Sequence, residues 1–338
     1  MGSSFLEKTI NVVNIEDKLE PSFIIGNNYE MQEIADLVER VKAIDSTVLI
    51  MGESGTGKSL LAKYIHKKGE NKNYPFVHIN CASLPANLIE SELFGHERGA
   101  FTGAISTKIG KFEKAGKGTV FLDEISSLTP ELQAKLLVAL EERTFERVGG
   151  TKSIPLSARI VAATNADLDT AVAKKEFRED LFYRLNVIPI TLPPLRYNKE
   201  NIEVFMNYFL HKFQKKFNRT AIKISYNVLG ALKCYDWPGN VRELENTIER
   251  AIAICKTSTI TLEDLPLKIK ERITAQGKEI ESAIFTKNSL GDSERTVILE
   301  ALRQNFGHRE KTAIFLGISR RTLQNKLKKY NILTDPLK

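Results

Sequence analysis

The chain has 338 residues, of which 42% are hydrophobic and 27% are charged, a balance typical of a globular protein with a formal net charge of +7. No apolar run approaches the roughly 18 residues that a membrane helix needs. No basic stretch followed by an apolar core marks a secretory signal, so we expect a cytoplasmic protein without a membrane partner.

The three cysteines, Cys81, Cys234 and Cys255, are far apart and odd in number. None has the spacing of a zinc site with another cysteine or with a histidine. We therefore predict free thiols in a reducing cytoplasm, in preference to a metal or redox site. The histidines are also not expected to bind metal; they are His66, His78, His96, His211 and His308.

Residues 1–22 show no strong periodicity and are expected to form an N-terminal arm or a linker. Between 23 and 192, short apolar runs alternate with helical patterns. Runs that are apolar throughout are typical of a parallel sheet covered on both faces. The alternation predicts a doubly wound α/β domain. The five candidate strands are 47–51, 76–79, 119–122, 159–163 and 187–191.

Pro193-Pro194 interrupts this pattern, and 193–266 is expected to form a second, helical subdomain with helices only over 200–265. A phenylalanine recurs at every fourth position, which favours core packing over a ligand site. Residues 267–291 are polar and mixed and are predicted to be a linker. Residues 292–338 have the pattern helix, helix, turn, helix. The four phenylalanines are Phe205, Phe209, Phe213 and Phe217.

A P-loop pattern follows the first apolar run and begins a helix, which is the context that this motif requires. Its glycines let backbone N–H groups approach a triphosphate, and a helix N-terminus favours an anion. Lys58 is expected to reach the β- and γ-phosphates of ATP, and the Ser59 hydroxyl to bind Mg²⁺. The motif comprises Gly52, Glu53, Ser54, Gly55, Thr56, Gly57, Lys58 and Ser59.

Two acids end the apolar run 119–122. Asp123 suits a direct or water-mediated contact with Mg²⁺, and Glu124 suits a base that orients water for attack on the γ-phosphate. An acidic strand end alone is usually a solvated loop. Together with the P-loop, it predicts ATP hydrolysis.

Between these motifs lies a hexapeptide that the residues alone would define only as a glycine-hinged loop. It resembles the GAFTGA signature of the sigma-54-dependent transcriptional activators, the bacterial enhancer-binding proteins of the NtrC-like AAA+ family. The resemblance extends from Phe23 to Asn331. It implies an AAA+ ATPase with a helical lid, and a loop that touches sigma-54 through Phe101 and Thr102. The hexapeptide is Gly99, Ala100, Phe101, Thr102, Gly103 and Ala104.

The resemblance implies further roles at the nucleotide. Asn80 corresponds to a switch residue that restrains Glu124 until the nucleotide state changes. Asn165 corresponds to sensor I, which reads the γ-phosphate, and Arg242 to sensor II on the lid. Ile25-Gly26 would help to line the adenine pocket.

Arg178 and Arg184 resemble two arginine fingers that reach into a neighbouring subunit's site. Without the family, surface ion pairs would be the stronger interpretation of both residues. The chain departs from the family at Ser59, where relatives often have Glu, and this serine restores the general P-loop pattern. Family members often carry an N-terminal regulatory domain such as a phosphoreceiver, so the resemblance also implies a two-component system.

The C-terminal residues carry most of the excess charge: 293–338 contain ten basic and four acidic residues. Such a balance favours a polyanionic partner. An apolar stripe is expected on a first helix, a second helix over 311–316, a turn at Gly317, and an N-cap at Ser319. Leu323 and Leu327 are expected to face inward. The stripe comprises Val297, Ile298, Ala301 and Leu302.

The last predicted helix begins with Arg and Thr side chains that suit bases and phosphates of a DNA major groove. The segment resembles the Fis-type helix-turn-helix that ends many of these activators and usually dimerises. A solvated basic helix is the alternative. The expected DNA contacts are Arg309, Arg320, Arg321, Thr322, Gln324, Asn325 and Lys326.

Together these features predict an ATP-dependent activator of the sigma-54 RNA polymerase holoenzyme. Dimers would bind double-stranded DNA upstream of a promoter, and a hexameric or heptameric ring would remodel the closed complex. One alternative is a DNA-binding regulator for which the nucleotide is only a ligand, and which does not need Glu124, Arg178 or Arg184. Another is an AAA+ remodeller of a different target, which the GAFTGA loop disfavours.

Overall fold

The computed structural model describes residues 29–219, 222–272, 297–299, 301–302, 308–316, 318–330 and 332. The chain divides into two compact units, with the boundary between Leu265 and Pro266. Within the described residues, none of the helices combines the length and the apolar character needed to cross a membrane. The three cysteines are free, as predicted.

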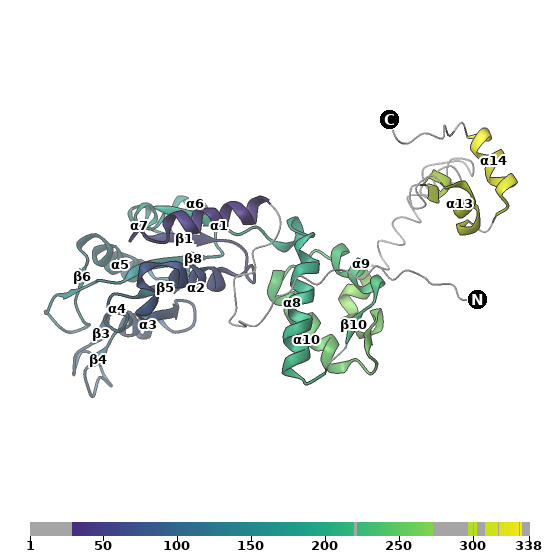
Figure 1. The fold of residues 1–338 in the computed structure, drawn as a ribbon. Coiled ribbons are helices and arrows are strands. Elements are labelled where there is room, and N and C mark those ends of the chain that lie inside the picture. Colours follow the sequence, from purple (N-terminus) through teal and green to yellow (C-terminus); the bar gives the residue numbers. More distant parts are fainter. Residues whose placement is uncertain are drawn as a thin grey trace. The chain divides into compact units, whose positions relative to one another are not determined.

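A five-stranded sheet with the order β2-β5-β8-β1-β9 forms the centre of the N-terminal unit (Figure 1). All four strand pairs are parallel, which confirms the predicted α/β class. Each of the five apolar runs forms a strand. The strands are β1 (Val48–Met51), β2 (Phe76–Asn80), β5 (Thr119–Asp123), β8 (Arg159–Thr164) and β9 (Ile188–Thr191).

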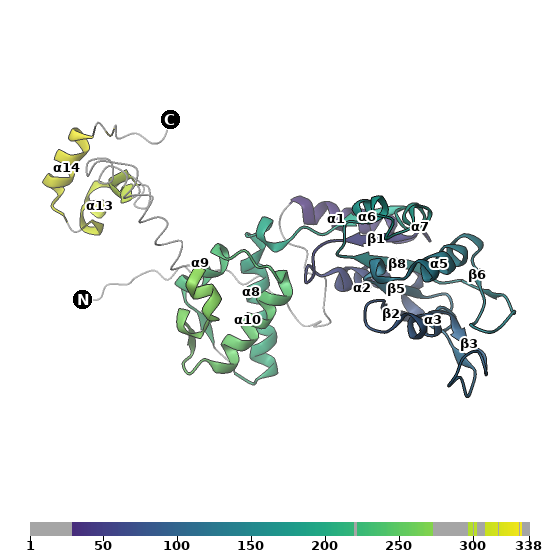
Figure 2. The same ribbon diagram turned by 180° about the vertical axis from the view of Figure 1, so that it is seen from behind.

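Helices cover both faces of this sheet (Figure 1, Figure 2). Alternate residues of a strand point to opposite faces, so Leu49 lies in one core cluster and its neighbour Ile50 in the other. Residues of α1 and α2 complete the cluster around Ile50, and residues of α3, α5 and α7 complete the cluster around Leu49. The helices are α1 (Tyr29–Val41), α2 (Lys58–Lys68), α3 (Ala86–Phe94), α5 (Pro130–Glu142) and α7 (Glu179–Leu185).

The second half of this unit is mostly helical, and α8 packs against α10. Phe209 and Phe213 are buried as predicted, whereas Phe217 is 36% exposed at the end of the stripe. The prediction of helices only was wrong, because two short strands pair in parallel there. Strands of two residues are too short to show a periodicity. The elements are α8 (Asn201–Lys216), β10 (Lys223–Ile224), α9 (Tyr226–Cys234), α10 (Asn240–Ile254) and β11 (Thr259–Ile260).

The C-terminal unit contains α13 (Arg309–Phe315) and α14 (Arg320–Lys329), with helical residues also at 267–272 and 297–302 apart from 300, which lies outside the described residues. Its core cluster contains Leu323 and Leu327, which confirms their inward orientation. On the predicted apolar stripe, Ile298 and Ala301 are buried, whereas Val297 is 50% exposed. The predicted turn residue Gly317 lies outside the described residues.

Candidate functional site

The P-loop lies at the carboxyl end of β1, between β8 and β9. The chain continues from there to β2 at the edge of the sheet, so the loop is at a topological switch point, where α/β proteins bind ligands. Gly57 has a φ of 103° and precedes α2 without any side-chain cap. No N-cap side chain therefore binds the first N–H groups of α2, which suit an anion.

Four predicted residues meet beside this loop. The Ser59 hydroxyl donates to Asp123 Oδ2 at 3.3 Å. Lys58 Nζ lies 3.7 Å from Glu124 Oε1 and donates to the Gly52 carbonyl at 2.8 Å. The Lys58 side chain is only 6% exposed. Burial lowers the pKa of Lys58 from its ordinary value, while Glu124 and Asp123 oppose this effect.

Glu124 occupies a left-handed backbone conformation with a φ of 54°. Its Oε2 accepts a hydrogen bond from the backbone N–H of Asn165 at 3.2 Å, so the end of β8 does contact the predicted base. The Oδ1 of Asn80 instead accepts from Ala82 N–H at 2.8 Å. Among the described residues, Asn80 and Glu124 line one cavity but form no hydrogen bond with each other.

His78 is a neighbour of Asp123 that the sequence did not single out. Its Nε2 lies 3.5 Å from Asp123 Oδ2. Burial alone would raise the pKa of Asp123, but the His78 hydrogen bond and the charge of Lys58 hold it below its ordinary value. His78 and Asn80 are two residues apart on β2 and share a face, a pattern that could have revealed this contact.

The helical subdomain closes the site from the other side. The Arg242 N–H donates to the Gly55 carbonyl at 3.3 Å, and its Nη1 to Ser54 Oγ at 3.3 Å. A Cβ at Gly55 would lie 2.3 Å from the Gly239 carbonyl, so only glycine fits there. A cavity of about 450 Å³ results, lined by Ser54, Gly55, Gly57, Lys58, Ser59, Leu60, Asn80, Asp123, Glu124, Val241, Arg242 and Glu245.

Glu53 is part of the P-loop motif, but its carboxylate pairs with the helical subdomain. Arg196 donates to both carboxylate oxygens, at 2.6 and 2.8 Å, and Asn240 Nδ2 donates to Oε2 at 3.2 Å. These hydrogen bonds, first that of Arg196, lower the pKa of Glu53 to about 2. Asn240 also binds the Ser54 carbonyl and the Leu195 N–H. The sequence did not identify Arg196 and Asn240 as contacts of the P-loop.

A second, more apolar cavity of about 170 Å³ shares Gly57, Leu60, Val241 and Glu245 with the first. Its wall combines aromatic and aliphatic side chains, which suits a planar base. The predicted adenine contacts Ile25 and Gly26 lie outside the described residues. The apolar wall includes Met31, Leu192, Leu195, Phe205, Tyr208 and Phe209.

The two predicted arginine fingers belong to α7 and its N-cap. Arg178 pairs with Asp180 through two hydrogen bonds of 3.0 and 2.6 Å, and its side chain is 45% exposed. Arg184 Nη2 donates to the Leu140 carbonyl at 2.7 Å. Neither arginine lines the cavity that contains Lys58.

The GAFTGA residues form a turn between β3 (Gly95–His96) and β4 (Lys108–Ile109), at one end of the unit in both ribbon views (Figure 1, Figure 2). Gly99 N–H donates to the Ala104 carbonyl at 2.9 Å. Gly99 and Gly103 have φ values of 83° and 103°, which favour glycine. Phe101 is 41% exposed, Thr102 is also exposed, and Ala104 is buried.

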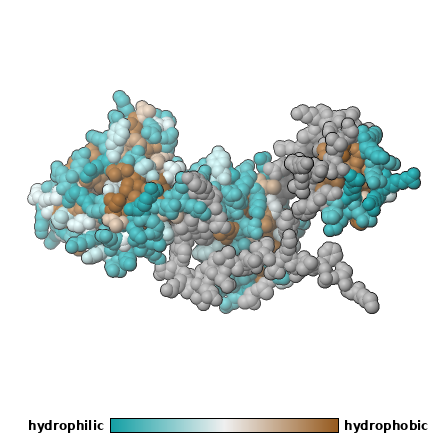
Figure 3. Space-filling view, turned by 45° about the horizontal axis from the view of Figure 1, so that its top comes forward, coloured by the Kyte–Doolittle hydropathy of each residue, from teal (hydrophilic) through white to brown (hydrophobic). Residues whose placement is uncertain are grey.

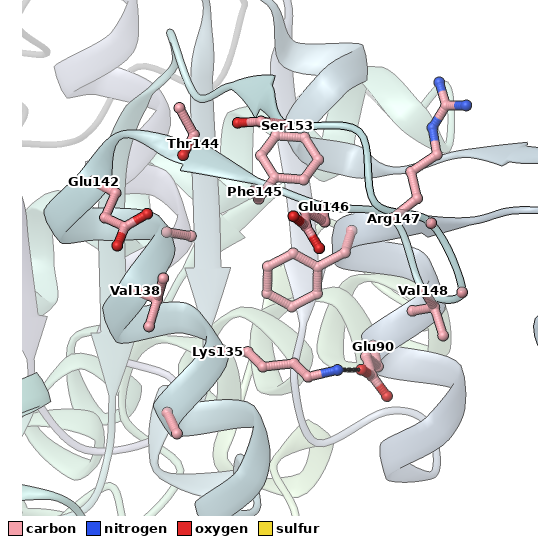
Figure 4. Close-up of a pocket in the computed structure, with 15 residues that line it drawn as sticks. Glu90, Lys135, Val138, Glu142, Thr144, Phe145, Glu146, Arg147, Val148 and Ser153 are labelled. Carbon is pink, nitrogen blue, oxygen red and sulfur yellow. Dashed lines mark hydrogen bonds and ion pairs between the residues drawn. The ribbon is translucent and has the colours of Figure 1, made fainter.

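Arg147 holds the base of this turn from the segment between β6 (Thr144–Phe145) and β7 (Ile154–Pro155). Its guanidinium binds Glu97 at 2.8 Å and Glu113 at 2.8 and 2.9 Å. Beside it lies a cavity of about 580 Å³, across which Lys135 pairs with Glu90 (Figure 4). Arg147 therefore ties the base of the loop to the segment that follows α5, and Lys135 ties α5 to α3.

The predicted DNA-contacting residues lie on α14 and at the start of α13. All those on α14 are exposed except Lys326, which is half-buried, and hydrophilic side chains predominate on the visible coloured face of this unit (Figure 3). Ser319 Oγ accepts from Thr322 N–H at 3.1 Å, which confirms the N-cap. The Thr322 hydroxyl is itself 2.7 Å from Ser319 Oγ.

The chain matches three protein-family models. Residues 24–191 match the Sigma-54 interaction domain, residues 196–282 the AAA+ ATPase lid domain, and residues 289–330 the bacterial regulatory protein, Fis family. These matches follow one another in the order of the expected ATPase, lid and DNA-binding domains.

Similar proteins include a regulatory protein and a nitrogen fixation protein. The regulatory protein AtoC of Escherichia coli is 46% identical over 93% of this chain and 68% of its own length. The nitrogen fixation protein AnfA of Azotobacter vinelandii is 44% identical over 94% of this chain and 59% of its own length, so this chain corresponds to only part of it. The structure of NtrX from Brucella abortus in complex with ADP has a TM-score of 0.68 at 31% identity, covering 91% of this chain and 70% of that one. The chain belongs to the family of sigma-54-dependent activators, with an AAA+ ATPase domain and a Fis-type helix-turn-helix.

Proposed function

We propose that this protein uses ATP hydrolysis in an oligomeric ring to remodel sigma-54 RNA polymerase at a promoter. The observation that carries the proposal is the cavity where Lys58, Ser59, Asp123 and Glu124 meet under Arg242. It combines a cationic P-loop lysine with two carboxylates at the end of a buried strand. ATPases of this class need these groups together.

The residues divide the chemistry among them. Lys58 and the N-terminus of α2 hold the phosphates, and Glu124 orients the attacking water. Ser59 and Asp123, 3.3 Å apart, fit the ligand set of Mg²⁺, which when bound supplies positive charge beside the phosphates. Asn165 and Arg242 lie where they respond to the phosphate state. The apolar cavity beside Leu60 accepts the adenine base.

We infer that each site is completed by a neighbouring subunit. Arg178 and Arg184 lie outside the cavity of their own chain, and the Arg178 side chain is exposed. A guanidinium donated across an interface stabilises the charge that develops during phosphoryl transfer. Hydrolysis by an isolated subunit is therefore slow, and a hexameric or heptameric ring is the active form.

The exposed turn with Phe101 and Thr102 is the part that contacts sigma-54. Hydrolysis moves this turn through Arg147 and the segment that follows α5.

The exposed residues of α14 bind double-stranded DNA as part of a dimer. A protein that binds the bacterial chromosome acts in the cytoplasm. The division into domains at 23–192, 193–266, 267–291 and 292–338 stays a prediction.

The test is the ATPase rate per subunit against protein concentration for the wild type and for Glu124→Ala, with Thr102→Ala as the matched variant on the loop. We expect a rate that rises with concentration, vanishes in Glu124→Ala and persists in Thr102→Ala, which loses only sigma-54-dependent transcription. Tight ATP binding with a flat, negligible rate at all concentrations would favour the nucleotide-sensing regulator instead. Transcription that survives Thr102→Ala would refute the role of the loop.

A further inference from the structure

The side chain of Gln133 binds three backbone groups of two chain segments inside the α/β half of the N-terminal unit. It lies on α5 and is 0% exposed. Its Nε2 donates to the Leu128 carbonyl at 2.8 Å and to the Glu176 carbonyl at 3.1 Å. Its Oε1 accepts from the Arg178 N–H at 2.8 Å. Both amide protons and the amide oxygen are therefore used, and only one orientation of the amide satisfies all three contacts.

One of these segments leads directly to the predicted base. Glu124 begins a short turn in which Ser127 N–H donates to the Glu124 carbonyl at 3.0 Å. Leu128 N–H in turn donates to the Ile125 carbonyl at 3.2 Å. Two successive turns thus join Glu124 to the carbonyl that Gln133 binds. A displacement of Glu124 can therefore be transmitted to Gln133 through these few hydrogen-bonded residues.

The other segment carries the predicted finger, Arg178. Glu176 belongs to the connection between α6 (Leu168–Ala173) and α7, and Arg178 is the N-cap of α7. The Arg178 side chain is at the surface and contacts Asp180, so its direction depends on where its backbone is held. Gln133 provides a buried hydrogen bond at that backbone position.

We propose that Gln133 is a positioning residue that fixes the base of Arg178 and couples it to the Glu124 of the same subunit. This inference rests on the proposed function, in which Arg178 completes the site of the next subunit. A change of nucleotide state at Glu124 then alters the position of Arg178 in the neighbouring site, and the side-chain amide of Gln133 transmits the change. The amide is suited to this role because it is both donor and acceptor and is fully buried.

The direct test replaces Gln133 by leucine, which has a similar size but no hydrogen-bonding atoms. We expect the ATPase rate of assembled protein to fall about ten- to a hundredfold, because a catalytic group displaced by about 1 Å can lose about a hundredfold in rate. Gln214→Leu is the matched control, since Gln214 Nε2 donates to a single carbonyl, Ile222 O, in the helical subdomain. This control keeps its rate.

A mixing experiment separates positioning from a merely structural effect. Gln133→Leu subunits have an intact site but a misplaced finger, whereas Glu124→Ala subunits have a dead site but an intact finger. Rings assembled from both variants regain ATPase activity if the defect of Gln133→Leu acts on the neighbour. Mixtures of Arg178→Ala with Glu124→Ala serve as the reference and regain activity in the same way.

If Arg178→Ala alone hydrolyses ATP at the wild-type rate, the finger assignment fails and this inference fails with it. If the Arg178→Ala mixture recovers but the Gln133→Leu mixture stays inactive, the proposed function stands and the positioning role is refuted. Should Gln133→Leu not fold, Gln133→Glu replaces it in the same mixture. That variant keeps the acceptor for Arg178 N–H and places a carboxylate against the carbonyls of Leu128 and Glu176.

Discussion

Asn240→Ala tests how the helical subdomain is held against the P-loop. Asn240 is 0% exposed, and its Oδ1 accepts from the buried N–H of Leu195 at 2.8 Å. Its Nδ2 donates to Glu53 Oε2 and to the Ser54 carbonyl. The backbone is left-handed, with a φ of 51°, a conformation that asparagine tolerates better than alanine does. Alanine therefore loses three contacts and gains backbone strain.

The expected loss of stability follows from the lost hydrogen bonds and the backbone strain. An unsatisfied buried N–H at Leu195 costs about 1–3 kcal/mol. The left-handed conformation adds about 1 kcal/mol. The contact with Glu53 adds less, because that carboxylate is partly exposed to solvent. We expect the free energy of unfolding to fall by about 2–4 kcal/mol, a large part of the roughly 5–15 kcal/mol that stabilises a typical domain.

Urea unfolding followed by tryptophan fluorescence measures this effect. The single tryptophan, Trp237, is fully buried three residues before Asn240. Asn240→Gly is the control, because glycine loses the same hydrogen bonds without the strain and should be about 1 kcal/mol more stable than the alanine variant. Wild-type stability of Asn240→Ala to within about 0.5 kcal/mol would refute the reasoning, since such a value is typical of an uninvolved surface site.

Three further results are expected. In the folded protein, maleimide modifies the exposed Cys234 but not the buried Cys81. Burial and the nearby carboxylates raise the pKa of Cys81 to about 12, so its thiol is not ionised at neutral pH. Mass spectrometry after digestion identifies the modified cysteines. The pKa of Glu53 falls from 4.5 to about 2 on folding, so its ion pair is fully stabilising above pH 4.5 and is lost as the pH falls toward 2. Between pH 5 and 3, the free energy of unfolding should then fall less for Glu53→Gln than for the wild type. An equal fall in both proteins would contradict this. Leu327→Ala removes a buried side chain of the C-terminal unit and should cost about 2–5 kcal/mol there, abolishing DNA binding while the ATPase rate persists.

Local patterns in the sequence were sufficient for the central sheet. The three inner strands, β1, β5 and β8, are buried along most or all of their length, so their unbroken apolar runs predicted strands of a sheet covered on both faces. The edge strands β2 and β9 have one buried residue each. The lid strands β10 and β11 escaped prediction because each has two residues and is defined only by its partner. The P-loop, the acids of β5 and the GAFTGA hexapeptide were recognisable because their residues are adjacent in the chain.

The sequence by itself determined the five strands of the central sheet, the phosphate-binding loop and the chemistry expected of the nucleotide site. These depend on periodicity and on motifs of consecutive residues, which the chain carries before it folds. Only the tertiary structure decided that Glu53 faces the lid, that His78 joins Asp123, and that Gln133 binds the N-cap of α7. Each of these contacts joins residues at least 45 positions apart, and the packing of the elements alone brings them together.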